Sequence, residues 1–248
     1  RLSAQVPVNV AYELCSAQAD WLGQVNQFDG AVPLYREIVE RYTPDPQKDV
    51  VRRLDALAAL GRALTEVGRF DAAARAFEEG LEAAVSIDSA IWISAFQQNS
   101  GRLAQSMHRW NLAGEWLNQA VRTAEGTRSK EARALACLYL GWFQALIGRY
   151  DDAIARCQQA VALRRDVVAK PEEEISAAHE DQVSGAEPVL TQPDGYYSPI
   201  GQRTRLAFAY LKLGDAYRYS GPKNRKKARS SYEKALALVP GGLEYRLR

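Results

Sequence analysis

Histidine and cysteine, which often carry out acid–base, nucleophilic and metal chemistry, are rare in this chain. The histidines are His108 and His179, and cysteines stand at positions 15, 137 and 157. His179 precedes Glu180 and Asp181, but it has no second histidine at i+4 and no cysteine partner, so the spacing of a metal site is missing. No Walker, dinucleotide-binding, HExxH or GxSxG motif occurs. The sequence therefore predicts a protein that is not an enzyme and holds no metal or cofactor.

The three cysteines are an odd number without CxxC spacing. Cys15 and Cys137 fall at equivalent positions of a repeat described below, and Cys157 takes a place that other copies give to an aromatic residue or leucine. We interpret all three as small buried hydrophobic side chains rather than as a metal or redox site. Free thiols in a core favour a cytoplasmic location.

Composition excludes several classes of protein. Hydrophobic residues make up 47% and charged residues 25% of the chain, as in soluble, core-forming domains. A net charge of +2 gives no strong field toward nucleic acid or anionic membrane. No apolar run approaches the ~20 residues that span a bilayer, and no signal peptide is visible. The chain begins with Arg1 and contains only Met107, which indicates a processed protein or a piece of a longer one.

One repeated spacing organises the chain. Gly61, Gly101 and Gly141 are 40 residues apart, and Gly214 begins another copy. In the clearest copy, apolar residues around Gly61 follow the i, i+4 spacing of a helix, and a glycine at position 68 ends it. A second helix follows, with alanines and aromatic residues on one face. The chain therefore repeats a helical hairpin rather than building one globular core.

The same small and aromatic residues return in every copy. The pattern consists of Gly61, Gly68, Phe70, Ala73, Phe77 and Gly80; of Gly101, Ala104, Trp110, Ala113, Leu117 and Ala120; of Gly141, Gly148, Tyr150, Ala153, Cys157 and Ala160; of Gly214, Tyr217, Gly221, Ala228, Tyr232 and Ala235; and, more faintly, of Ala19, Leu22, Phe28, Ala31, Tyr35 and Ile38.

This pattern resembles the tetratricopeptide repeat family over about residues 8–165 and 203–240. The usual family repeat has ~34 residues, whereas the steps here are 42, 40 and 40 residues. The longer step is similar to that of kinesin-light-chain repeats and of arrays in large bacterial signalling proteins. The resemblance implies an all-α, right-handed superhelical solenoid of antiparallel helix pairs, with the first helix of each pair lining a concave groove. We expect one solenoid over residues 1–248, with repeats at about 8–45, 54–86, 94–126, 134–166 and 207–240.

Residues 167–202 interrupt the period. They contain four prolines, an acidic run at 172–174 and few apolar residues, which predicts an inserted loop. A degenerate extra repeat is the alternative. Tyr196 and Tyr197 are candidate contact residues in this loop, unless they pack on the neighbouring helices.

Helical spacing selects the residues that face the groove. Positions two, five, nine and twelve of each first helix share one face. In the four clearer copies these residues are Asp55, Ala58, Arg62 and Thr65; Ala95, Gln98, Arg102 and Gln105; Leu135, Leu138, Trp142 and Ala145; and Phe208, Leu211, Asp215 and Arg218. From these positions and two neighbours, Asn99 and Tyr139, we select as predicted peptide-binding residues Arg62, Gln98, Asn99, Arg102, Gln105, Tyr139, Trp142, Asp215 and Arg218.

The predicted face changes from basic to aromatic along the chain. Arg62 and Arg102 occupy equivalent positions that Trp142 takes in the next copy. Arginine binds carboxylate or phosphate, amides satisfy a peptide backbone, and tryptophan anchors an apolar side chain. Family members that grip a C-terminal carboxylate use a lysine, asparagine and arginine clamp; Arg62, Asn99 and Arg102 stand at comparable positions, but the two lysines are missing. The alternative is a solvated polar face with Trp142 partly buried.

The sequence thus favours a non-catalytic scaffold that binds a protein or peptide, with an acidic segment as a candidate ligand. One alternative is a ligand-sensing or autoinhibitory arm of a multidomain bacterial STAND-type ATPase or transcriptional regulator, whose partners would be other domains of the same full-length chain. A threefold excess of arginine over lysine fits a GC-rich genome. Another alternative is an accessory domain of an enzyme whose catalytic part lies outside this chain. The basic cluster at 223–229 favours a solvated turn over a nucleic-acid contact, and we expect no membrane partner.

Overall fold

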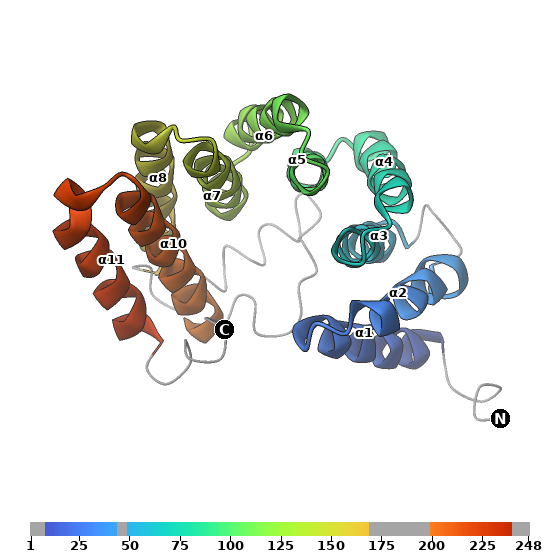
Figure 1. The fold of residues 1–248 in the computed structure, drawn as a ribbon. Helices are drawn as coiled ribbons and strands as arrows, with labels where there is room; N and C mark the ends of the chain where they lie inside the picture. The colour runs from blue at the N-terminus through green and yellow to red at the C-terminus, as the bar shows by residue number, and fades with distance from the viewer. Residues whose placement is uncertain (1–7, 44–48, 169–198, 240–248) are drawn as a thin grey trace. The chain divides into compact units, whose positions relative to one another are not determined.

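The computed structural model describes residues 8–43, 49–168 and 199–239, and within these ranges it contains helices and turns but no strand (Figure 1). The all-α class predicted from the repeat is confirmed. The helices are α1 (Val8–Gln24), α2 (Phe28–Glu37), a π-helical turn (Ile38–Tyr42), α3 (Val50–Glu66), α4 (Phe70–Ser86), α5 (Ala90–Ser106), α6 (Trp110–Glu125), α7 (Lys130–Leu146), α8 (Tyr150–Val168), α10 (Pro199–Tyr219), a 3₁₀ turn (Pro222–Asn224) and α11 (Arg225–Leu238).

The chain forms two compact units, residues 1–116 and 117–248, and the boundary between them lies within α6. In the N-terminal unit α1 packs on α2, α2 on α3, α3 on α4 and α4 on α5. In the C-terminal unit α7 packs on α8, α8 on α10 and α10 on α11, while α10 also contacts α7. Each unit is therefore built from consecutive helix pairs, the arrangement of a tetratricopeptide-like helical repeat.

Glycine is needed in the first helix because an aromatic ring of the second helix lies against it. A Cβ atom added to Gly61 would lie 2.2 Å from Cε1 of Phe77, and one added to Gly214 would lie 2.5 Å from Cε1 of Tyr232. Real Cβ atoms do not approach other atoms so closely. The repeated glycine therefore sets the distance between the paired helices, and the ring fills the space beside it.

The turn between the two helices of a pair requires a left-handed backbone. Gly68, Gly148 and Gly221 adopt φ angles of 75°, 82° and 107° there. In the other two copies Asn26 and His108 take the same place, with φ angles of 59° and 57°. Asparagine and histidine enter this region more readily than most residues. The structure thus gives His108, the one described histidine, a position in a turn, with its ring 5.8 Å from that of Trp110.

A buried ion pair ties three helices of the C-terminal unit together. The Arg164 side chain on α8 is 3% exposed, and its Nη2 lies 2.6 Å from Oε1 of Glu131 on α7. Its Nη1 donates a hydrogen bond of 2.8 Å to the carbonyl oxygen of Arg205 on α10. The equivalent positions of the two preceding copies hold alanines 84 and 124, both fully buried. We name Arg164, Glu131 and the Arg205 carbonyl the clasp.

The predicted insertion falls largely outside the described residues. α8 continues to Val168 and α10 begins at Pro199, so residues 169–198, with Tyr196 and Tyr197, are not described. The division of the chain into five repeats and an insertion stays a prediction.

Candidate functional site

An aromatic and cationic cluster lies on the first helices of the C-terminal unit. Trp142 projects from α7 and Phe208 from α10, and both side chains are exposed, at 38% and 40%. Between them lies Lys212 of α10, whose Nζ is 3.8 Å from the ring centroid of Trp142 and 5.3 Å from that of Phe208. A cation over an aromatic face is attracted by the electrons of the ring. The contact holds Trp142 and Lys212 in place while leaving part of the indole accessible.

Asp215 completes the cluster, one turn along α10 from Lys212. Its Oδ2 lies 3.9 Å from Nζ of Lys212, and its Oδ1 accepts a hydrogen bond of 2.9 Å from the Tyr232 hydroxyl of α11. Burial lowers the pKa of Lys212, and the carboxylate of Asp215 opposes that decrease. Burial and the bond to Asp215 raise the pKa of Tyr232 to about 12, so its hydroxyl keeps its proton at neutral pH. We call Trp142, Phe208, Lys212 and Asp215 the aromatic cluster.

Arg218 lies one turn beyond Asp215 on the exposed surface of α10. Its guanidinium is 4.8 Å from the ring centroid of Tyr219 and donates a hydrogen bond of 3.0 Å to the Tyr219 hydroxyl. The predicted residues Trp142, Asp215 and Arg218 are thus distributed along neighbouring first helices, as the helical spacing required. Tyr139 is half-buried one turn before Trp142 on α7.

In the N-terminal unit the corresponding face is polar and internally paired. Arg102 of α5 forms an ion pair of 3.7 Å with Glu66 of α3. Arg62 is exposed on α3, and its charge partly opposes the increase in the pKa of Asp55, which burial raises to about 6. The carboxylate of Asp20 adds to that increase, and it accepts a hydrogen bond of 2.6 Å from the Tyr35 hydroxyl. Each arginine of this face therefore has a carboxyl group nearby.

The predicted amides of α5 differ in accessibility. Gln98 is 3% exposed and donates a hydrogen bond to the Ser94 hydroxyl, and Asn99 is buried as well. Gln105 is half-buried near the end of the helix. Gln98 and Asn99 therefore offer little surface to a ligand, although both are among the predicted peptide-binding residues.

Lys212 was missed as a site residue, although the sequence held a signal for it. It stands two residues before Gly214, and the residues two before Gly101 and Gly141 are Asn99 and Tyr139. Lys212 therefore stands at the position that Asn99 and Tyr139 occupy in their copies. Its contact with Trp142 could not be read from the spacing, because α7 and α10 are not consecutive helices.

The residue types most often used in metal and thiol chemistry have the following places in the described residues. No group of three or more histidine, cysteine, aspartate or glutamate side chains in them could hold a metal ion. Cys15, Cys137 and Cys157 are buried and free, as predicted, and burial raises the pKa of Cys157 to about 12, so that its thiol is a poor nucleophile. None of the helices in the described ranges combines the length and hydrophobicity needed to cross a membrane.

Comparisons with known proteins agree with this fold. Residues 56–87 and 136–167 match the family model described as tetratricopeptide repeat. No curated protein matches the chain. Among solved structures, BtubC (BKLC) from P. vanneervenii is similar over 96% of this chain and 81% of its own, with 19% identity and a TM-score of 0.56. A putative kinesin light chain with nearly identical TPR-like repeats from Podosopora anserina is similar over 98% of this chain and 100% of its own, with 18% identity and a TM-score of 0.51. At such identities the likeness concerns the fold alone.

Proposed function

Because the chain is a tetratricopeptide-repeat protein, we propose that it is a non-catalytic scaffold that binds a peptide segment of a partner protein on the first-helix face of its C-terminal unit. The observation that carries this proposal is Trp142, an exposed indole held by Lys212 of the neighbouring first helix. Tryptophan is enriched among the residues that dominate binding energy, and a fixed side chain loses little conformational entropy when a partner docks.

The chemistry of the aromatic cluster suggests what the partner presents. Trp142 and Phe208 offer an apolar surface, while Lys212 carries a positive charge beside them. An apolar side chain next to an aspartate or glutamate would satisfy both features. Exposed arginine at position 62 of the N-terminal unit provides a separate basic position for an acidic segment.

A peptide array followed by calorimetry tests the proposal. Trp142→Ala should weaken binding of the selected peptides at least tenfold, because loss of a central aromatic anchor costs about 2 kcal/mol or more. Trp110→Ala is the matched control, since Trp110 is also an exposed tryptophan but begins the second helix α6. Equal affinities of wild type and Trp142→Ala would refute this assignment.

The charge preference has its own test. Lys212→Met keeps an apolar stem against the two rings but removes the charge, so it should retain hydrophobic peptides and lose the preference for acidic ones. Arg62→Ala with Arg102→Ala tests the N-terminal unit in the same array. If only this double variant changes the peptide profile, the binding face belongs to the N-terminal unit instead.

A further inference from the structure

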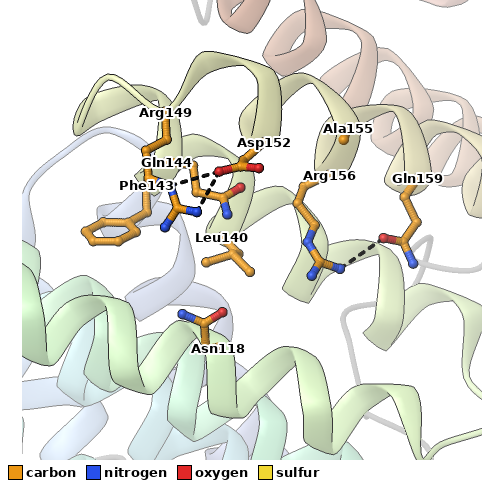
Figure 2. Close-up of a pocket in the computed structure, with 9 residues that line it drawn as sticks. All are labelled: Asn118, Leu140, Phe143, Gln144, Arg149, Asp152, Ala155, Arg156 and Gln159. Carbon is orange, nitrogen blue, oxygen red and sulfur yellow. Dashed lines mark hydrogen bonds and ion pairs between the residues drawn. The ribbon is translucent and has the colours of Figure 1, made fainter.

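A polar cavity of about 500 Å³ lies among α6, α7 and α8 (Figure 2). Its walls come entirely from the C-terminal unit. They are formed by Asn118, Leu140, Phe143, Gln144, Arg149, Asp152, Ala155, Arg156 and Gln159. A volume of this size is in the range of small-molecule sites.

Gln144 is the unusual residue of this cavity. It is 8% exposed, and its Oε1 has no hydrogen-bond partner. The same repeat position holds Leu64, Ala104 and Tyr217 in other copies, all of them buried. A buried acceptor without a partner destabilises a fold by about 1–3 kcal/mol, so an amide at a position suited to leucine calls for a functional reason.

Arg156 departs from the repeat in the same way. The two preceding copies hold Ala76 and Trp116 at its position. Its Nη1 donates a hydrogen bond of 3.2 Å to Oε1 of Gln159 and lies 3.8 Å from Glu125, and the side chain also hydrogen-bonds the Cys137 thiol, so the guanidinium is held in place beside the cavity (Figure 2). Two polar groups have thus replaced apolar ones in a single copy, and both line one cavity.

The charges of the walls limit the ligand. Arg149 forms an ion pair of 2.7 Å with Asp152, so Arg156 is the remaining charged group of the lining, and its charge is shared with Glu125, which lies outside the lining. One such charge suits one carboxylate and does not suit a polyphosphate. Oε1 of Gln144 is a buried acceptor without a partner, so the side chain must turn toward the cavity to be satisfied, and the ligand must then present a donor.

We propose that this cavity binds an amide N–H next to a single carboxylate, the chemistry of a peptide's carboxyl end and of an N-acyl amino acid. The N–H donates to Oε1 of Gln144, and the carboxylate accepts from Arg156. Leu140 and Phe143 pack against the apolar part of the ligand. This second site does not depend on the aromatic cluster, because its lining includes none of the cluster's residues.

The probes are N-acetyl-alanyl-alanine and its carboxyl amide, added to the isotope-labelled protein and followed by NMR at the side chains of Gln144 and Arg156. At the ligand efficiency usual for small ligands, about 14 non-hydrogen atoms correspond to a Kd on the order of 1 mM. We expect the acid to shift both signals and the amide to bind at least tenfold more weakly. Arg156→Gln should remove that difference, and Trp142→Ala should leave it unchanged.

Gln144→Leu separates a binding role from a structural one. It places the leucine of the clearest copy at this position, so it should raise the Tm and abolish binding of both probes. Gln119→Ala, an exposed residue of α6 outside the cavity, is the control and should change neither quantity. A lowered Tm in Gln144→Leu, or no signal shift with the acid, would overturn the proposal.

A longer peptide with the same carboxyl end identifies the source of the ligand. Affinity at least tenfold higher than that of the short probe points to a protein terminus. Equal affinity points to an N-acyl amino acid.

Discussion

The two units use one repeat for different surface chemistry. Each copy of the repeat begins with a glycine, or with alanine at position 19 in the first copy. The residue directly after it is Asp20, Arg62 or Arg102 in the N-terminal unit and Trp142 or Asp215 in the C-terminal unit. In the first unit Arg102 is paired with Glu66 and Arg62 lies near Asp55, whereas in the second Trp142 lies against a lysine and remains exposed. The glycine, alanine and aromatic residues fix the helix pairs, and the positions between them are free to acquire a binding function.

The units also differ in how their helices are held. The N-terminal unit has an ion pair between Arg53 of α3 and Glu79 of α4, which is partly exposed to solvent. The clasp of the C-terminal unit is buried and joins three helices. Burial changes the expected cost of breaking each pair, and this difference can be measured.

The largest effect is expected from removing one partner of the clasp. Glu131→Ala leaves the Arg164 charge buried without its carboxylate, which should lower the free energy of unfolding by about 3–5 kcal/mol. Glu79→Ala in the N-terminal unit should cost only about 0–1 kcal/mol, because water replaces an exposed partner. Urea unfolding monitored by circular dichroism compares the two variants. Equal losses would show that burial does not distinguish the pairs.

A smaller difference is expected at the glycines. Gly61→Ala forces a methyl group into the ring of Phe77 and should destabilise the protein by about 1–3 kcal/mol. At Gly141 the nearest atom to an added Cβ is Sγ of Cys157, at 3.1 Å, so a small shift can accommodate the methyl group. Gly141→Ala should therefore cost about 1 kcal/mol or less. Thermal unfolding of both variants checks this order, and a larger loss for Gly141→Ala would contradict it.

The pH dependence should distinguish the N-terminal unit. Burial raises the pKa of Asp55 from 3.8 to about 6, so the folded state binds more protons than the unfolded state between these values. The free energy of unfolding therefore decreases as pH rises through this window, by about 1–3 kcal/mol. Asp55→Asn should match wild type below pH 3.8 and be more stable above about pH 6.

The control for this titration is Asp29→Asn, at an exposed position of α2. Denaturant unfolding over the pH series gives the difference between each variant and wild type. If the Asp55→Asn difference does not change with pH, the buried carboxyl group does not cause the effect.

The smallest effects are expected at the helix turns. Gly148→Ala should cost about 1 kcal/mol, because alanine disfavours a positive φ. His108→Gly should be neutral or stabilising by less than about 1 kcal/mol at the equivalent turn. Differential scanning calorimetry of the two variants measures both. A clear loss in His108→Gly would show that the contact of its ring with Trp110 outweighs the backbone preference.

The repeat made the helices and turns predictable, because small residues, rings and left-handed turns recur at fixed spacing. The accessibility of individual side chains was harder to predict. Gln98 and Asn99 are polar yet buried, since their exposure depends on the helices that pack around α5. The contact of Lys212 with Trp142 joins helices that are distant in the sequence. Gln144 breaks the apolar pattern, but only the cavity beside it indicates why that matters.

The clasp bears on how this chain tolerates change. Arg164 of α8 binds both Glu131 of α7 and the backbone carbonyl of Arg205 on α10, so α10 is held by this contact and not only by the connection between α8 and α10. Lengthening a connection whose ends are already fixed costs little free energy, since the entropic cost grows only with the logarithm of its length. Residues can therefore be gained or exchanged between α8 and α10 while the last helix pair keeps its place, which makes this junction the natural position for a tag or an inserted domain.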